Sequence, residues 1–277
     1  MRPLLSPWRV VQHLLVLAVL VVLVSLGLWQ LERLGEVRER NAAQAARFEQ
    51  PAQPVGTLLD GLALGSDDDA LAQLEFRPVT ATGSYRPGDE VLQRGRSYQG
   101  RTGFHVLTPL DLADGGTVLV RRGWVPFDND LRPPVADAAP PESSVTVTGY
   151  VERSIPQPTG ALAQRDADEG ELDIVFNADL ARLDDQLGGA VLPMLVHLEA
   201  QEPAQTGQLP VPAPRPEQDE GTHLSYAVQW FAFAVIGAGF YGVLLRRRLR
   251  GDEQRPAAER TRDGDAAAGS GRTRTDA

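Results

Sequence analysis

The chain contains no cysteine among its 277 residues, no lysine, and only two methionines. Without cysteine no disulfide can brace an exported domain, so such a domain must be held by its own core. Copper(I) prefers thiolate and thioether ligands, so the same scarcity argues against copper handling. The sequence also lacks a Gly-x-Ser-x-Gly elbow, a phosphate-binding loop and a His-Glu-x-x-His helix. These absences do not favour a hydrolase or a transferase, and we expect that the protein is not an enzyme.

Two long apolar runs stand near the ends of the chain, Val10–Leu31 and Leu224–Leu245. At about 1.5 Å per residue, each is long enough to cross roughly 30 Å of hydrocarbon. Inside lipid the backbone must satisfy its own hydrogen bonds, so both runs are predicted to be helices, at 10–31 and 223–245. The sequence therefore predicts a membrane hairpin that holds residues 32–222 on one side of a bilayer.

Arginine is distributed unevenly around these two runs. Arg2 and Arg9 precede the first, and four arginines follow the second between positions 246 and 250. The positive-inside rule then places residues 1–9 and 246–277 in the cytoplasm. Residues 29–222 hold 16 Arg against 31 Asp and Glu, and such an acidic segment does not fit nucleic-acid binding.

The first apolar run has an alternative interpretation as a cleaved signal peptide, because a basic segment precedes it. Against this, the run is long, and Ser25-Leu26-Gly27 before Leu28-Trp29 is a poor cleavage site. Nine residues before the run are too few for an organelle transit peptide. We therefore expect a multi-pass protein of a bacterial plasma membrane, in contact with the lipid bilayer, with both termini in the cytoplasm.

The segment 32–222 has the length of one domain. Its first part, Glu32–Arg47, is predicted to continue the first membrane helix as a polar helix. Short β-like runs separated by turn residues follow, which predicts a mainly antiparallel β (α+β) domain outside the cytoplasm. The predicted strands are Phe76–Tyr85, Glu90–Arg94, Gly103–Leu110, Thr117–Val125, Ser144–Glu152 and Val191–Glu199.

Several smaller features complete this prediction. Asp114-Gly115-Gly116 is typical of a hairpin turn, and Asn177 is predicted to cap a short helix at Ala178–Gln186. Pro193 places the last predicted strand at a sheet edge.

Three segments are predicted to lack regular structure. The acidic stretch around Asp67–Asp69 is expected to be a solvated loop. The Pro-rich segment 203–216 is expected to be a stiff tether into the second membrane helix. From Gly251 onward the charged, Ala/Gly-rich composition predicts a disordered cytoplasmic tail.

The four histidines differ in their surroundings. His13, His105 and His197 are interpreted as hydrogen-bonded packing residues. His13 and His223 cannot bind one metal ion, because about 18 helical residues, roughly 27 Å, separate their levels. At helical spacing, His223 shares a face with the residues Tyr226, Trp230, Ala234, Gly237 and Tyr241.

Two interpretations of this face stay open. The small residues leave room for a flat apolar ligand below the imidazole of His223. Alternatively, Tyr226 and Trp230 belong to the interfacial aromatic belt, while Ala234, Ala238 and Gly242 form a contact between helices.

A set of short motifs occurs in a fixed order between and within the two apolar runs. In chain order they are Leu26-Gly27-Leu28-Trp29-Gln30 with Arg33, Glu75-Phe76-Arg77-Pro78-Val79, Gly83-Ser84-Tyr85, Arg94, Gly100, Gly103-Phe104, Thr108-Pro109-Leu110, Val120-Arg121-Arg122-Gly123-Trp124-Val125-Pro126 and His223-Leu224-Ser225-Tyr226-Ala227-Val228-Gln229-Trp230-Phe231. Over most of residues 10–250 the chain resembles the Surfeit locus protein 1 family, assembly factors of haem-copper cytochrome oxidase.

The resemblance implies a role at the stage where haem a enters the largest oxidase subunit, with His223 as the iron ligand. It also implies oxidase subunits, and the enzymes of haem a synthesis, as partners. The isoprenoid tail of haem a would favour lipid, and Arg33 would pair with its propionates at the outer interface. Trp29 and Gln30 on the first helix, with Tyr226 and Trp230 on the second, would line the same site.

Two other functions remain open on the sequence. One alternative function is that of a scaffold that holds an oxidase assembly intermediate without binding haem. Without the resemblance, a membrane-tethered binding or sensor module would be the default interpretation.

Overall fold

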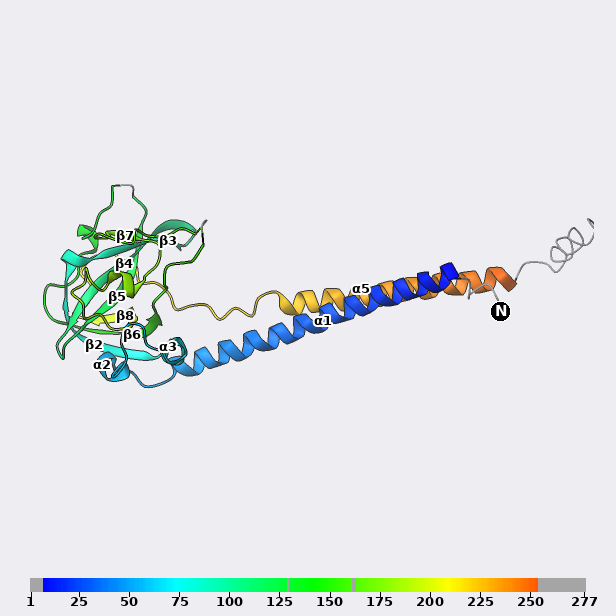
Figure 1. Ribbon diagram of the computed structural model, residues 1–277, viewed down its shortest axis with the longest axis horizontal. Helices are drawn as coiled ribbons and strands as arrows, with labels where there is room; N and C mark the ends of the chain where they lie inside the picture. Colours follow the sequence, from blue (N-terminus) through cyan, green and yellow to red (C-terminus); the bar gives the residue numbers. More distant parts are fainter. Residues whose placement is uncertain (1–6, 129, 161–162, 254–277) are drawn as a thin grey trace, which may run out of the picture. The chain divides into compact units, whose positions relative to one another are not determined.

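The computed structural model describes residues 7–128, 130–160 and 163–253 (Figure 1). The chain divides into two compact units. The helical unit is built from the two ends of the chain, up to Glu39 and from Asp219 onward, and the outer unit is Arg40–Gln218. Most of the predicted cytoplasmic tail, and residues 1–6, lie outside the described residues.

The helical unit contains two helices, α1 (Pro7–Phe48) and α5 (His223–Glu253). Both are long and apolar enough to span a membrane. Large apolar side chains such as Leu14, Val21 and Ile236 are more than half exposed, which is the pattern expected where lipid is the solvent. The polar extension predicted at Glu32–Arg47 is confirmed, because α1 continues without a break to Phe48. The helix α5 also continues past the predicted span, so the prediction of a disordered tail starting at Gly251 is wrong for its first residues.

The outer unit is built on one eight-stranded sheet. Its strands are β1 (Gln53–Pro54), β2 (Pro78–Tyr85), β3 (Val91–Tyr98), β4 (Arg101–Leu112), β5 (Thr117–Pro126), β6 (Val145–Arg153), β7 (Ile174–Val175) and β8 (Met194–Glu202). Short helices lie between them: α2 (Val55–Leu58), α3 (Asp68–Leu74), α4 (Leu180–Leu183) and the 3₁₀ turns at Pro87–Asp89 and Ala136–Ala138.

The strand order is β1-β2-β6-β8-β5-β4-β3-β7, and the sheet is mixed. The pairs β1–β2, β3–β7 and β5–β8 are parallel, and the other pairs are antiparallel. The expectation of a mainly antiparallel domain is therefore corrected to a mixed sheet. Alternation of side chains identifies a strand but carries no information about the direction of its neighbours, so the sequence pattern could not show this.

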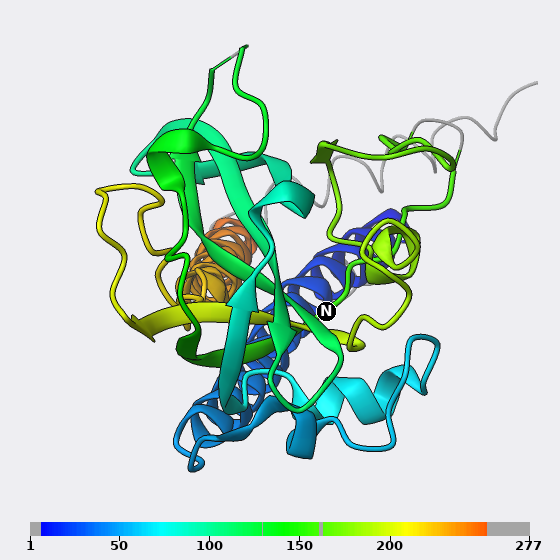
Figure 2. The same cartoon turned by 90° about the vertical axis from the view of Figure 1, so that its left-hand side faces the viewer.

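An additional pairing between β2 and β4 closes part of the sheet into a ring of five strands: β2, β6, β8, β5 and β4. In Figure 2 these strands cross around a common interior. The ring closes where Gly83 pairs with Leu112. A Cβ atom at Gly83 would lie 2.0 Å from the carbonyl oxygen of Asp111, so only glycine allows the two strands to approach this closely.

The interior of the ring is the main hydrophobic core. Val79 and Ala81 on β2, Val147 on β6 and Val196 on β8 are all almost fully buried in one cluster. The exposed Thr82 and Ser84 alternate with the buried positions of β2, as expected for a strand with one face on the core. Burial of each valine stabilises the fold by about 1.5–3 kcal/mol, which lets the unit dispense with disulfides.

Most predicted strands lie where the sequence places them, within a few residues of the expected ends. The predicted hairpin turn at Asp114-Gly115-Gly116 is confirmed, since it joins β4 to β5 and the Leu112 amide donates to the Gly116 carbonyl, with N···O 3.0 Å. The last strand is not at an edge, because β8 lies between β6 and β5. It begins at Met194, so Pro193 precedes the strand and removes no ladder hydrogen bond.

Three further predictions are corrected by local contacts. Asp179, not Asn177, caps α4, because its carboxylate accepts from the Arg182 amide. The acidic stretch is not only a loop, because α3 begins at Asp68. The Pro-rich segment is not merely a tether, since the Val211 backbone exchanges two hydrogen bonds with that of Trp124, with N···O distances of 2.7 and 2.8 Å.

Candidate functional site

The two long helices meet through a hydrogen bond that involves His223. Its Nδ1 atom lies 2.9 Å from Oε1 of Gln30, a residue 193 positions earlier in the chain. An amide oxygen can only accept, so the imidazole carries its proton on Nδ1. In the neutral ring with this tautomer, Nε2 is the nitrogen that can coordinate a metal ion.

The residue two positions before His223 leaves space beside this nitrogen. Gly221 has φ +69°, and a Cβ atom there would lie 3.5 Å from Nε2 and 3.4 Å from Cδ2 of His223. The amide of Gly221 donates to the Asp219 carboxylate at 2.8 Å, which fixes this conformation just before α5. Any side chain at position 221 would be strained by this backbone conformation, and its Cβ atom would lie in van der Waals contact with the imidazole.

Below His223, α5 packs against α1 through small residues. Ala227 and Ala234 are buried, and a Cβ atom at Gly27 would lie 2.7 Å from the ring of Phe231. Further along, a Cβ atom at Gly237 would lie 3.6 Å from Leu20. The small-residue part of this face therefore packs against α1.

The far end of the helix pair carries a second polar contact, in which His13 Nδ1 hydrogen-bonds to the hydroxyl of Tyr241. Their rings meet edge to face, with centroids 5.8 Å apart. The expectation that His13 is a hydrogen-bonded packing residue is confirmed. Two of the small residues proposed for the helix contact, Ala238 and Gly242, are exposed, and Ala234 is buried.

The other predicted site residues occupy the outer half of the two helices. Tyr226 and Trp29 are about half exposed, at 48% and 55%, and Trp230 is partly buried with its ring edge to face with Phe233. Arg33 ion-pairs with Glu36 at 2.6 Å, one helical turn further on. Among the predicted residues the structure joins His223 directly to Gln30, whereas Arg33 already has a carboxylate partner.

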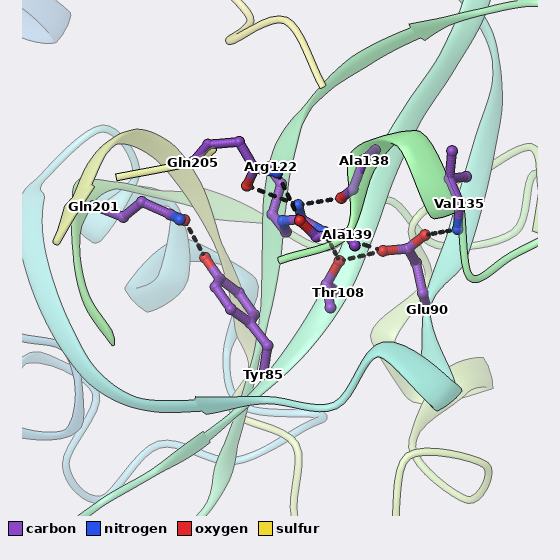
Figure 3. Close-up of polar contacts among 9 residues, drawn as sticks. All are labelled: Tyr85, Glu90, Thr108, Arg122, Val135, Ala138, Ala139, Gln201 and Gln205. Atoms are coloured by element: carbon purple, nitrogen blue, oxygen red, sulfur yellow. Dashed lines mark hydrogen bonds and ion pairs between the residues drawn. The ribbon is translucent and has the colours of Figure 1, made fainter. Parts of the chain in front are cut away.

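A second polar arrangement lies inside the outer unit, where the sequence did not predict a site (Figure 3). The guanidinium of Arg122 on β5 and the carboxylate of Glu90 are 3.2 Å apart, and both side chains are almost completely buried. Thr108 donates to the same carboxylate at 2.8 Å, and the Val135 amide donates to its other oxygen at 2.9 Å.

The Arg122 network connects segments that are far apart in the sequence. Arg122 also donates to the carbonyl of Ala138 and to the amide oxygen of Gln205, while Gln205 in turn donates to the carbonyl of Ala139. Burial raises the pKa of Glu90 above its usual value, and the hydrogen bonds and Arg122 only partly oppose this shift. The network fixes two loops to the sheet; its signal in the sequence is the pair of arginines, Arg121 and Arg122, within a largely apolar strand.

Comparison with known proteins places the chain in a family. A model described as the SURF1 family matches residues 17–235. An uncharacterized SURF1-like protein of Mycobacterium tuberculosis (strain H37Rv) is 31% identical over 240 residues, which are 82% of each chain. The chain belongs to the SURF1 family. A SURF1-like protein of Rickettsia felis is 29% identical over 43% of this chain and 48% of its own, and one of Dictyostelium discoideum is 32% identical over 38% of each.

The SURF1 match includes Gln30 and His223 as well as the whole outer unit. The family is generally known for oxidase assembly factors and not for enzymes. With two helices able to span a membrane, this chain has the features of a membrane-bound member of that family.

Proposed function

We propose that this protein assists the assembly of haem-copper cytochrome c oxidase in a bacterial plasma membrane by binding haem a through His223 and presenting it to the largest subunit. The observation that carries the proposal is the His223–Gln30 hydrogen bond. It uses Nδ1 of the imidazole and leaves Nε2 as the nitrogen that would coordinate iron. Imidazole is a common axial ligand of haem iron, and a second hydrogen bond from its other nitrogen orients it.

The surroundings of His223 suit an amphipathic cargo. The half-exposed Trp29 and Tyr226 offer apolar surface at the same end of the helix pair, where aromatic residues favour the membrane interface. The isoprenoid tail of haem a would lie in lipid. Arg33 would leave its ion pair with Glu36 and pair with a propionate instead. Because the Arg33–Glu36 pair is exposed, breaking it costs little free energy.

In this proposal both termini lie in the cytoplasm and the outer unit lies on the opposite side of the membrane. The arginines that follow α5 support this orientation through the positive-inside rule. Oxidase subunits, chiefly the largest, would be the partners, and the enzymes of haem a synthesis would supply the cargo.

The first experiment measures haem a in detergent-purified full-length protein that is co-expressed with haem a synthesis enzymes. We expect a haem a absorption spectrum in the wild type and in His13→Ala, and its loss in His223→Ala. His13 is the matched control because it is also a membrane-helix histidine bonded to the partner helix. Haem retained equally by His223→Ala would contradict the site, and no haem in the wild type would favour a scaffold.

The role of Gln30 is tested in the same preparation by titration with haem a. Gln30→Leu removes the acceptor that fixes the imidazole tautomer, and we expect affinity to fall about 10–100-fold. Gln12→Leu, in the inner half of α1, is the control. An unchanged affinity in Gln30→Leu would show that His223 needs no orienting partner.

A scaffold that never binds haem is the alternative function. Oxidase subunits that co-purify equally with the wild type and with His223→Ala, together with normal oxidase content in cells that express the variant, would support it.

A further inference from the structure

The outer unit contains a cavity of about 470 Å³ on the face of the sheet where β3, β4, β5 and β6 contribute side chains. This volume is within the range of small-molecule sites. The cavity is built entirely from the outer unit, and it is separate from the buried Arg122 network.

The wall formed by the strands is polar and largely buried. Arg96 comes from β3, His105 from β4, Arg121 from β5 and Glu152 from β6. Arg121 and Glu152 form an ion pair, and their side chains are only 11% and 14% exposed. This pair leaves the charge of Arg96 as the excess charge of the wall.

Arg96 has no ion pair with any carboxylate in the part of the chain that the structure describes. Its near neighbour is the uncharged amide of Gln93; Arg121 repels it, and Glu152, which is already paired with Arg121, attracts it more weakly. The pKa of Arg96 is lowered, first by burial and then by Arg121. A half-buried cation of this kind favours an anionic partner, because an unpaired charge is costly away from water.

Other nitrogens of the same wall also lack acceptors. Nε of Arg96, Nε of Arg121 and Nδ1 of His105 are buried without a hydrogen-bond partner among the described residues, so a ligand in the cavity would meet the other nitrogens of Arg96 and His105. Burial, followed by the charges of Arg121 and Arg96, lowers the pKa of His105 to about 3, so the imidazole is neutral at physiological pH. A neutral imidazole donates one hydrogen bond without adding charge.

The opposite side of the cavity is apolar, and at its polar rim one arginine faces two carboxylates. Phe76, Ile155, Pro156 and Pro216 line it, and Ile155 is 42% exposed. At the rim, Arg153 ion-pairs with both Glu75 and Asp68, at 3.2 and 3.3 Å. The rim therefore offers no free cation and carries one excess negative charge, so attraction for an anion comes only from Arg96 on the buried wall.

We propose that this cavity binds a small organic carboxylate with an apolar body, its carboxylate on Arg96 and His105 and its body against Ile155 and the prolines. A planar carboxylate matches the fork of a guanidinium better than a spherical anion does. The apolar side selects an aliphatic or aromatic acid over an inorganic oxyanion. This site does not depend on haem binding or on His223.

The test uses the full-length protein in detergent, without haem, and measures binding of 4-phenylbutyrate by calorimetry. Sodium phosphate and sodium chloride at equal ionic strength are the comparison anions. We expect saturable binding of 4-phenylbutyrate, at least tenfold tighter than phosphate. Equal binding of phosphate, or no saturable binding of any of the three, would overturn the proposal.

Two variants and one control locate the site. Arg96→Gln should weaken binding of 4-phenylbutyrate at least tenfold, whereas Arg94→Gln should leave it unchanged. Arg94 is on the same strand but stacks over Phe176, with its guanidinium carbon 4.5 Å from the ring centroid, and it does not line the cavity. Ile155→Asp places a negative charge at the exposed mouth without disturbing the core, so it also should abolish binding. Unchanged affinity for 4-phenylbutyrate in either cavity variant would overturn the proposal. If Arg96→Gln does not fold, the affinity of Ile155→Asp alone tests the proposal.

Discussion

The helical unit and the outer unit bury polar groups in different ways. The two helices are joined by single hydrogen bonds near their ends, His223 to Gln30, His13 to Tyr241 and Arg248 to Gln12, with small apolar residues between. The outer unit encloses a full ion pair, Arg122 with Glu90, that is satisfied from several sides. A neutral contact that can be remade suits a site that takes up and releases cargo, whereas a buried charge pair fixes one arrangement.

The largest effect is expected from breaking the ion pair of the outer unit. Arg122→Met leaves Glu90 buried without its cation, and we expect the free energy of unfolding to fall by about 3–5 kcal/mol. Urea unfolding of the detergent-solubilised protein, followed by the β signal in circular dichroism, measures it. The control Arg165→Gln breaks an exposed pair with Asp168 and should cost less than about 1 kcal/mol. Equal losses in the two variants would contradict the structural role of the network.

A smaller effect is expected from acid, again in the outer unit. Because the pKa of His105 is lowered to about 3, its contribution to stability is present above about pH 6.5 and is lost as pH falls towards 3. Over the first 1.5 pH units below 6.5 this amounts to roughly 2 kcal/mol. His105→Gln should therefore lose about that much less stability than the wild type between pH 7.5 and pH 5, in the same urea assay.

The groups that face His105, including Arg121, Arg96, His197 and Glu152, are present in both proteins. The raised pKa of Glu90 acts in the opposite sense and is also common to both. Parallel acid curves for wild type and variant would show that His105 is not buried in its neutral form.

An effect of similar size is expected in the helix pair, and it tests whether close packing is as decisive there as charge is in the outer unit. Gly27→Leu forces a side chain into the ring of Phe231 and should weaken the pairing of α1 and α5 by about 1–3 kcal/mol. Gly35→Leu is the control, since a Cβ atom at Gly35 meets nothing within 4 Å.

The absence of native cysteine makes this pairing measurable without background. With Leu20→Cys and Gly237→Cys, oxidation should join the two helices, and fragments cut between them should stay together on a non-reducing gel. The link should form in the Gly35→Leu background and be reduced in Gly27→Leu. A link that forms equally in both would show that Gly27 does not set the contact.

The sequence predicted the elements that depend on local periodicity. Apolar length indicated α1 and α5, and alternation with turn residues indicated β2 and β4. The two-residue strands β1 and β7 escaped prediction because two residues show no period. The parallel pairing of β8 and the closure of the ring also escaped, because both depend on which distant segments meet.

The candidate site, too, has a part that the sequence predicted and a part that only the folded structure shows. His223 and Gln30 were expected at one level of the membrane, because helical rise alone sets their depth. Their direct contact, and the tautomer that it fixes, depend on how each helix is rotated about its axis. The cavity of the outer unit was missed because its wall comes from four strands whose neighbours only the folded sheet defines.

The closed ring of the outer unit has a consequence for recognition. Strands β2, β6, β8, β5 and β4 use their backbone hydrogen bonds on one another, and the sheet ends at the two-residue strands β1 and β7. These short strands cover little of the neighbouring edge: β7 pairs with only Leu92 and Gln93 of β3, so the rest of that edge of β3 has no strand partner among the described residues. A protein that docks on the five ring strands must read side chains and loops, whereas the edge of β3 is where a partner could add a strand through its backbone.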